Sequence, residues 1–422
     1  MTGTARTAVK KGIQEFLLVA TPKAIGGMAL IGLNLTLVRF LPPDAFGRYY
    51  VCLTAVVLAD AVIGAAFDMG VLRLAPAYIA NDMTYAIAIE RAALLLKVGL
   101  ASLVTLVLLV DPGFVSQAVF HRSGAETLLY LTIGSAVGLL LLRSGLVHLQ
   151  VRRAFRAYGL VDFSHMAIKF GGVGLGIALL PVDPEHVLIF FALGPAVAFG
   201  GFLVRYGRVF WQSLVRNGAA FKELLGYVKW YLITFAAGAI ISRFDLIMLT
   251  SRAGIDEVGI FSGAHAYALI PEVFGTYLTV VLSPRIVPLC QQQKFFGFFR
   301  GVQLGLLALA LSIFALAVGL HQSVAALLFP PSFLPSANVI LILLPGALAN
   351  MATFPLTLPF LMFQRPRFFL SLEVATLPAL VIAYTYAIDA HGAIGAAWVT
   401  TLARLAKLTI ANTLAYRLAK QN

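Results

Sequence analysis

The chain has 422 residues, of which 60% are hydrophobic and only 12% are charged. Soluble domains usually carry about 25% charged residues, so this chain lacks the polar side chains that would cover soluble domains of its size. Its 37 glycines, 19 prolines and 2 cysteines also exclude collagen-like, disordered and disulfide-stapled classes. The composition therefore predicts an all-α polytopic membrane protein.

The net charge of +13 arises from 31 Lys and Arg residues against 18 acidic ones. In a soluble protein this balance would indicate nucleic-acid binding. In a membrane protein an excess of Lys and Arg in the cytoplasmic loops gives the same number. The positions of the charges decide between the two interpretations.

Apolar runs of roughly 17–25 residues, the length that crosses a bilayer, predict about twelve transmembrane helices. The connections between them are short, and none is long and polar enough to fold as a soluble domain. In chain order, the predicted spans are 12–40, 50–70, 92–110, 127–149, 160–180, 187–204, 227–249, 259–283, 301–320, 336–361, 371–388 and 394–416.

The loop charges predict the orientation. Both termini and the even-numbered loops together hold 20 basic residues, whereas the odd-numbered loops hold 4. Basic residues concentrate on the cytoplasmic side, so both termini are expected there. This topology accounts for the basic excess without any nucleic-acid partner.

An internal repeat appears when the chain is shifted by 212 residues. Asp44–Tyr49 then falls on Asp256–Phe261, both with the pattern Asp, any residue, apolar, Gly, any residue, aromatic. Arg73–Pro76 falls on Arg285–Pro288 in the same register. Two six-helix halves with similarly placed basic loops but no common origin are the alternative, and these gapless matches argue against it.

The repeat predicts an N-lobe over residues 1–211 and a C-lobe over 212–422, each with six helices. Because six is even, the two repeats are parallel and related by an axis along the membrane normal. Two such bundles facing each other across a central cleft are typical of a transporter.

Ionisable residues inside predicted spans are candidates for function, because each costs about 2.5–3.5 kcal/mol on insertion scales. The basic ones are Lys23, Lys97, Arg143, Lys169, Arg243, Arg404 and Lys407, and the acidic ones are Asp60, Asp68, Asp162, Asp245, Glu272 and Glu373. Several deep cations suit an anionic substrate such as a phosphate or pyrophosphate.

Five cations are predicted to bind such a substrate. Lys23 lies too deep in the first span to reach the interface easily, whereas Lys97 lies near a cytoplasmic end and is expected to extend toward it. Arg143 either faces the interior or packs against an acid on a neighbouring helix. The complete set of substrate-binding candidates is Lys23, Arg143, Lys169, Arg243 and Arg404.

Two acids are candidates for ion coupling. Asp60 lies mid-span and is either a proton- or cation-linked carboxylate or a partner of Lys23 or Arg143. Asp245 follows Arg243 by two residues, so on a continuous helix the two side chains diverge by about 200° and cannot neutralise each other. The acids Asp68, Glu272 and Glu373, near span ends or prolines, are expected to be structural.

Enzymatic and metal-binding motifs are absent from the sequence. Cys52 and Cys290 have no Cys or His neighbours with ligand spacing, and the glycine run Gly171–Gly176 lies inside an apolar span, where helix packing explains it. We therefore expect no metal, no cofactor and no enzymatic activity, with H⁺ or Na⁺ as a potential coupling ion.

Short motifs resemble one transporter family. Leu37–Tyr49 resembles the end of the first helix of polysaccharide flippases, and Phe67–Gly70 followed by Arg73 continues the likeness. Arg243–Asp245, Asp256–Phe261 and Leu282–Arg285 resemble the opening of the family's second half. The chain is similar to the Wzx-like branch of the multidrug/oligosaccharidyl-lipid/polysaccharide (MOP) exporter superfamily.

The resemblance implies alternating-access translocation of an undecaprenyl-pyrophosphate-linked oligosaccharide across the bacterial inner membrane, for surface polysaccharide export. It also implies contact with membrane lipids and with a polysaccharide polymerase machinery. Members of the family often carry two further helices, which are not predicted here. The alternatives are an ion-coupled multidrug antiporter of the same superfamily, whose cavities are acid-rich, and a membrane-embedded enzyme of envelope assembly.

Overall fold

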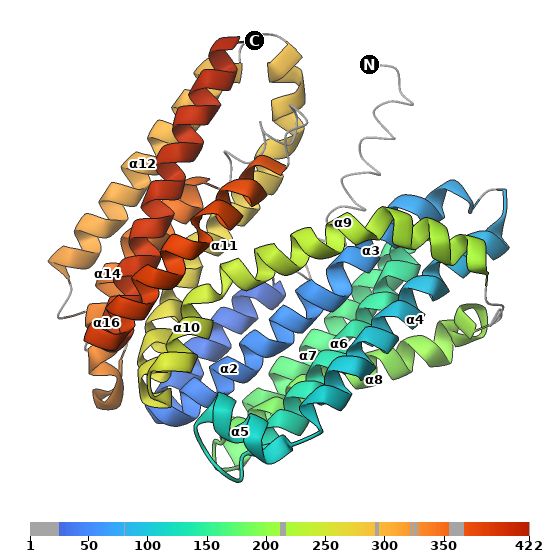
Figure 1. The fold of residues 1–422 in the computed structure, drawn as a ribbon, viewed down its shortest axis with the longest axis horizontal. Helices are drawn as coiled ribbons and strands as arrows, with labels where there is room; N and C mark the ends of the chain where they lie inside the picture. The colour runs from blue at the N-terminus through green and yellow to red at the C-terminus, as the bar shows by residue number, and fades with distance from the viewer. Residues whose placement is uncertain are drawn as a thin grey trace. The chain divides into compact units, whose positions relative to one another are not determined.

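The computed structural model describes residues 25–79, 81–211, 217–291, 295–320, 323, 327, 329–353 and 367–421. Within this described part the chain is helical and contains no β-strand (Figure 1). Two compact units divide it: unit 1 holds described residues 25–30 and 49–240, and unit 2 holds residues 31–48 and 241–421. The predicted all-α fold is confirmed.

Unit 1 is built mainly from long antiparallel helices. They are α2 (Pro43–Ala59, whose first residues belong to unit 2), the π-helical turn η1 (Asp60–Ala65), α3 (Ala66–Leu74), the 3-10 turn η2 (Ala75–Ala77), α4 (Met83–Leu108), α5 (Pro112–Phe120), α6 (Glu126–Val151), α7 (Phe155–Leu179), α8 (Pro184–Trp211) and α9 (Gly218–Ser242).

Local sequence signals fix where several of these helices begin. The Asp82 carboxylate accepts a hydrogen bond from the Tyr85 N–H at 2.9 Å, and the Asp111 carboxylate accepts one from the Phe114 N–H at 2.9 Å. Each aspartate thereby satisfies a backbone donor that has no partner within its helix. Pro112 at the first position of α5 adds a fixed φ where no N–H is needed.

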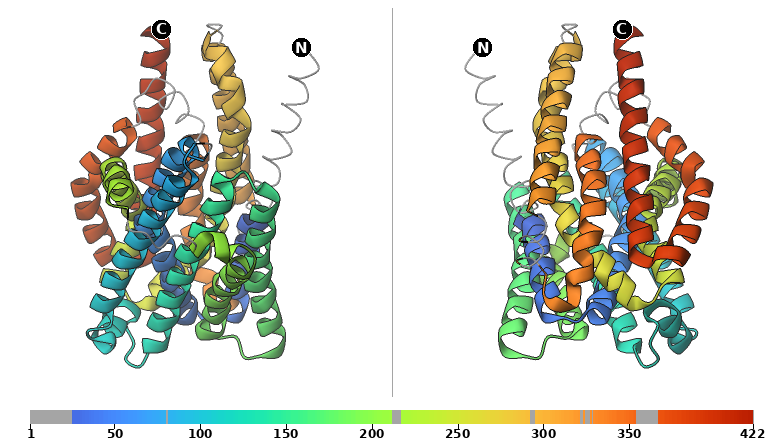
Figure 2. Two further views of the ribbon diagram at one scale, coloured as in Figure 1. Left: turned by 90° about the vertical axis from the view of Figure 1, so that its right-hand side faces the viewer. Right: turned by 90° about the vertical axis from the view of Figure 1, so that its left-hand side faces the viewer.

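Unit 2 contains the C-terminal part of the helix Ile25–Phe40 and the second half of the sequence. Its further elements are α10 (Phe244–Arg252), α11 (Ile255–Gln291), α12 (Phe295–Gly319), the 3-10 turn η3 (Pro331–Phe333), α14 (Leu334–Thr353) and α16 (Arg367–Gln421). α14 packs against both α11 and α16 and forms the centre of this unit. The long helices within each unit run alongside one another (Figure 2).

The helix α16 includes a sharp turn at Gly392, whose φ of 55° is strained for any residue with a Cβ. The predicted spans 371–388 and 394–416 lie on either side of this turn. The Glu257 carboxylate accepts a hydrogen bond from the Ala393 N–H at 2.7 Å and so caps the second segment. A side chain at Gly392 would also collide with this carboxylate.

The repeated motifs meet each other inside unit 2. A Cβ on Gly47 would strike the Ile255 carbonyl oxygen and lie 2.9 Å from the Gly259 nitrogen, and a Cβ on Gly259 would strike the Pro43 carbonyl oxygen. Pro43 and Ile255 are 212 residues apart, as are Gly47 and Gly259. The contact is therefore reciprocal at the offset of the repeat, with backbone against backbone in the first turns of α2 and α11.

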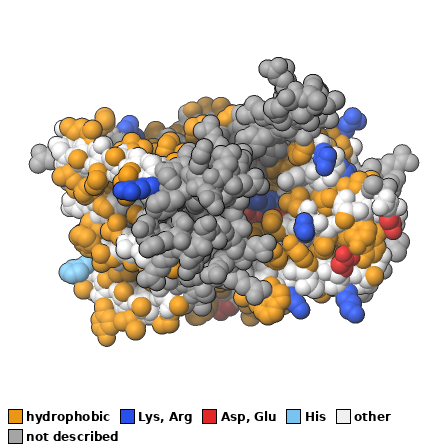
Figure 3. Space-filling model, turned by 90° about the horizontal axis from the view of Figure 1, so that it is seen from above, with side chains coloured by type: hydrophobic (Ala, Val, Ile, Leu, Met, Phe, Trp, Pro, Cys, Tyr) orange, Lys and Arg blue, Asp and Glu red, His pale blue; other side chains and the backbone are white. Residues whose placement is uncertain are grey.

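Eight of the described helices are long and apolar enough to cross a membrane. Hydrophobic side chains also cover much of the described surface in the view of Figure 3, as expected for helices that face lipid. The chain is a multi-pass membrane protein. The count of twelve spans stays a prediction.

We predict that Gly259→Ala lowers the thermal stability of the detergent-purified protein, because the methyl group forces two helix backbones apart. Gly99→Ala in α4 is the matched control, since its Cβ would meet no atom within 4 Å. Thermal unfolding followed by intrinsic fluorescence measures both variants. Equal melting temperatures for Gly259→Ala and the wild type would contradict the close contact.

Candidate functional site

Charged side chains gather in the interior of unit 1, and the first pair lies at a break in helix geometry. The Arg143 guanidinium in α6 lies 2.8 Å from Asp60 Oδ2. Asp60 is the first residue of the π-helical turn η1, a local distortion often found at functional sites. The other oxygen, Oδ1, is buried and accepts no hydrogen bond from the described residues.

The two side chains of this pair differ in exposure. Asp60 is 14% exposed, whereas Arg143 is 46% exposed. A guanidinium carries five N–H donors, and one carboxylate oxygen uses few of them. Arg143 therefore retains donors that an anionic ligand could take. The sequence left two possibilities for Arg143, a side chain facing the interior or one packed against an acid of a neighbouring helix. In the structure Arg143 lies beside such an acid, Asp60.

A second pair in unit 1 is fully enclosed. Lys97 in α4 is 2% exposed, forms an ion pair with Asp68 in α3, and donates a hydrogen bond to Ser144 at 3.1 Å. The expectation that Lys97 extends toward the membrane interface is thus wrong. The Asp68 carboxylate on α3 neutralises Lys97 inside the bundle. The lysine side chain therefore does not need to extend to water at the membrane interface.

The face of α7 that packs toward α8 contributes a third group. Asp162 and His165 are buried, with 4.0 Å between Asp162 Oδ1 and His165 Nδ1. One turn further, the Lys169 ammonium lies 4.4 Å from the centre of the Phe170 ring and 5.0 Å from that of Phe191. Among the described residues no carboxylate lies within ion-pair distance of Lys169, so these two aromatic faces are its partners.

Unit 2 also holds an ion pair between an arginine and an acid, like the Arg143–Asp60 pair of unit 1. The Arg404 guanidinium in α16 lies 2.6 Å from Glu272 Oε1 in α11, with side chains that are 16% and 15% exposed. Glu272 lies 212 residues after Asp60, the offset of the internal repeat. Equivalent acids in the two repeats thus each hold an arginine, although Arg143 and Arg404 themselves are not equivalent in the repeat.

Asp245 takes a different position in unit 2. It is 5% exposed in the first turn of α10, where the helix dipole favours a negative charge. Its Oδ2 accepts a hydrogen bond from Thr400 at 3.4 Å, and the Tyr384 hydroxyl lies 2.9 Å from the same Thr400 oxygen. This network of hydroxyl groups satisfies the carboxylate without a basic partner among the described residues.

Arg243 stands at a break between helices. α9 ends at Ser242 and α10 begins at Phe244, with Arg243 between them at φ −122° and ψ 16°. The premise that Arg243 and Asp245 share a continuous helix is therefore wrong. No ion pair joins Arg243 to a carboxylate within the described part of the chain.

The structure thus sorts the candidates into groups. It joins Arg143 to Asp60 and Arg404 to Glu272, and it leaves Lys169 and Arg243 without carboxylate partners in the described residues. Lys23 lies outside the described residues. Glu272, for which the sequence predicts a structural role, pairs with Arg404, and the repeat offset applied to Asp60 leads to the same residue.

The described residues contain no group of three or more His, Cys, Asp or Glu side chains placed to hold a metal ion.

Comparisons with known proteins identify the fold. The sequence matches no protein-family model and no curated protein. The structure resembles the lipid II flippase MurJ in its inward closed conformation, with a TM-score of 0.72 and 11% identity over 94% of this chain and 86% of that one.

Two further solved structures share the fold. A Pyrococcus furiosus transporter of the MOP superfamily, described as having a binding pocket of reverse polarity, gives a TM-score of 0.64 at 13% identity, over 96% of this chain and 95% of that one. The Vibrio cholerae MATE transporter VcmN in its bent form gives 0.59 at 13% identity, over 99% and 98%. The chain has the MOP transporter fold.

We predict that Lys97→Met strongly destabilises the protein, by about 3–5 kcal/mol, because it leaves Asp68 buried without its cation. The double variant Lys97→Met/Asp68→Asn should recover much of the loss, since it removes both charges together. Thermal unfolding in detergent measures the variants, with the exposed Arg156→Gln as control. Equal losses in the single and double variants would contradict a neutralising pair.

Proposed function

We propose that this protein is a MOP-type transporter that moves a polyprenyl-pyrophosphate-linked oligosaccharide across the bacterial inner membrane by alternating access, for surface polysaccharide export. Its termini would lie in the cytoplasm, and it would act without enzymatic chemistry of its own. The observation that carries the proposal is the pair of repeat-related carboxylates, Asp60 and Glu272, that each hold an arginine inside the helices.

Arginine suits this task for a geometric reason. Its planar fork binds a carboxylate or a phosphate through two parallel hydrogen bonds, and it stays charged under all physiological conditions. A pyrophosphate can therefore take the place of the carboxylate on Arg143 or Arg404 without leaving the guanidinium unpaired. The exchange is possible because each guanidinium is already oriented by its acid.

The carboxylates that lose their arginines would then couple substrate binding to the binding of a proton or a cation. Asp60 without Arg143 is a buried negative charge, which is unfavourable until it binds a proton or a cation. Glu272 likewise loses its arginine when Arg404 turns to the substrate. Substrate binding and ion binding are linked in this scheme through one guanidinium in each unit. Arg243 and Lys169, which lack carboxylate partners among the described residues, would add positive charge for the substrate.

The lipid-linked substrate is supported by one neighbour of the same fold, which is described as a lipid II flippase. The likeness itself extends to the fold alone, so the embedded arginines supply the argument for an anionic headgroup. Membrane lipids and a polysaccharide polymerase machinery are the partners that such a transporter would have.

A cation/drug antiporter is the second candidate. Asp162 and Asp245 are buried inside helices, and within the described residues neither lies at ion-pair distance from a Lys or Arg. Buried acids without a Lys or Arg partner suit cationic drugs. The arginine pairs favour the anionic substrate over this alternative.

We predict that Arg143→Lys and Arg404→Lys each lower translocation of a fluorescent polyprenyl-pyrophosphate oligosaccharide in proteoliposomes by at least about tenfold. Lysine keeps the charge that neutralises the acid but loses the bidentate geometry. We also expect Lys23→Ala and Arg243→Ala to abolish translocation while leaving membrane insertion intact.

Arg252→Lys is the matched control, because Arg252 also holds a carboxylate, Asp389, through two hydrogen bonds of 3.1 and 3.0 Å, but at an exposed helix end. This variant should translocate like the wild type. Wild-type rates in both Arg143→Lys and Arg404→Lys would contradict the proposed roles. Export of a cationic dye without any flipping would favour the antiporter instead.

A further inference from the structure

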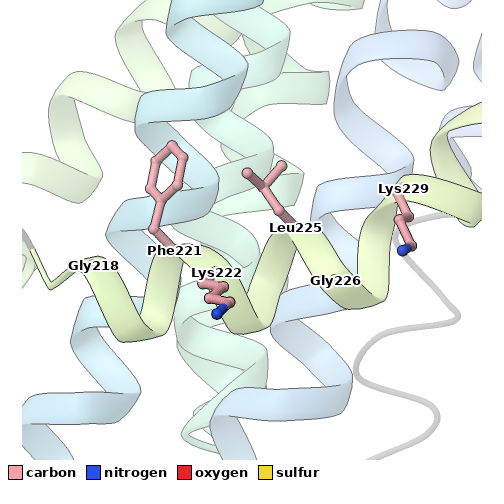
Figure 4. A pocket seen from close by; sticks show the side chains of 6 residues that line it. All are labelled: Gly218, Phe221, Lys222, Leu225, Gly226 and Lys229. Atoms are coloured by element: carbon pink, nitrogen blue, oxygen red, sulfur yellow. The ribbon is translucent and has the colours of Figure 1, made fainter.

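One face of α9 carries a basic hollow that the proposed function does not use. The hollow has a volume of about 530 Å³ (Figure 4). It is lined by Gly218, Phe221, Lys222, Leu225, Gly226 and Lys229.

The spacing of these residues places them along a single helix face, because positions three, four, seven and eight apart are neighbours on an α-helix. Lys222 and Lys229 are seven residues apart, which separates them by about 10.5 Å along the axis. A Cβ at Gly218 or Gly226 would meet no atom within 4 Å. Gly226 thus leaves open the space between the two lysines, and Gly218 leaves open the space before Lys222.

The opposite face of the first turns of α9 packs against the rest of unit 1. Ala220, Leu224 and Val228 are at most 1% exposed and belong to the core of unit 1. Beside them Glu223 accepts hydrogen bonds from the hydroxyl groups of Tyr78 at 3.2 Å and Tyr85 at 2.7 Å. The acid in this turn is therefore held by tyrosines, and among the described residues the charges that line the hollow are those of the two lysines.

The surroundings place this face at a membrane interface. α9 begins at the end that the loop charges predict to be cytoplasmic. Trp230 is 64% exposed with the Lys229 ammonium 5.9 Å from its ring, and Ile233 in the next turn is 60% exposed. Tryptophan and lysine favour the headgroup level, and exposed isoleucine favours the acyl chains.

We propose that this face of α9 binds an anionic phospholipid of the cytoplasmic leaflet, with its phosphate between Lys222 and Lys229. In Figure 4, Phe221 and Leu225 project to one side of α9 and the lysine side chains to the other edge. A ligand with a charged head and an apolar tail matches this division. Free phosphate would leave Leu225, which is 39% exposed, without a partner.

The proposal does not depend on transport. A bound phospholipid at α9 would be a resident lipid of unit 1, whatever the substrate that the protein moves. Lipid binding can therefore be measured on the purified full-length chain with no transport assay.

The test is native mass spectrometry of the detergent-purified protein, titrated with phosphatidylglycerol or with zwitterionic phosphatidylethanolamine. We expect Lys222→Gln/Lys229→Gln to weaken phosphatidylglycerol binding about 30-fold, or about fivefold per lysine, and to leave the weaker phosphatidylethanolamine binding unchanged. Arg156→Gln/Arg205→Gln is the matched control, since both arginines are exposed in unit 1 on the same predicted side.

Three outcomes would overturn the proposal. The first is equal loss in the control variant, which would indicate general surface charge. The second is displacement of the lipid by millimolar inorganic phosphate, which would assign the hollow to a free anion. The third is a Lys222→Gln/Lys229→Gln variant that keeps phosphatidylglycerol but loses a polyprenyl phosphate, which would assign the face to substrate entry. Unchanged melting temperatures would show that all variants are folded.

Discussion

Helix packing in both units is governed by the cost of burying charge: a charged side chain inside a bundle of apolar helices is stable only where polar, aromatic or oppositely charged groups compensate it. An isolated ion there costs several kcal/mol even after local relaxation. Within the described residues Lys97 meets Asp68, Arg143 meets Asp60 and Arg404 meets Glu272. Each of these contacts joins two helices, so the pairs fix helix packing as well as charge.

The same constraint separates structural pairs from functional candidates. Lys97 and Asp68 are enclosed and held further by Ser144, which leaves no room for a ligand. Arg143 is nearly half exposed and has donors to spare. The recurrence of an acid–arginine pair at Asp60 and Glu272, one in each repeat, is difficult to explain by packing alone, because the arginines come from different helices. Each unit thus holds an arginine beside a carboxylate, the arrangement on which the proposed function rests.

The fold followed from the sequence more readily than the site did. Long apolar runs predict membrane helices because the bilayer leaves the backbone few other choices, and the glycines of the repeated motif, Gly47 and Gly259, lie where the repeats meet. The partner of Lys97 could not be predicted, since it depends on which helices become neighbours. The break at Arg243 escaped, because it interrupts an apolar run that continues across it, whereas the turn at Gly392 lies between two predicted spans. Glu272 could be identified from the sequence, because it lies 212 residues after Asp60, which is the offset of the repeat.

Whether the protein binds anionic or cationic ligands tests the proposed transport of a pyrophosphate-linked substrate most directly. Binding of a short polyprenyl pyrophosphate, a neutral polyprenol of equal length and a hydrophobic cationic dye would be compared by tryptophan fluorescence. The Lys222→Gln/Lys229→Gln background prevents any contribution from the face on α9. We expect saturable binding of the polyprenyl pyrophosphate, which weakens at least about tenfold in Arg143→Lys. We expect no comparable binding of the polyprenol. Binding of the dye with no binding of the pyrophosphate would contradict the proposed transport.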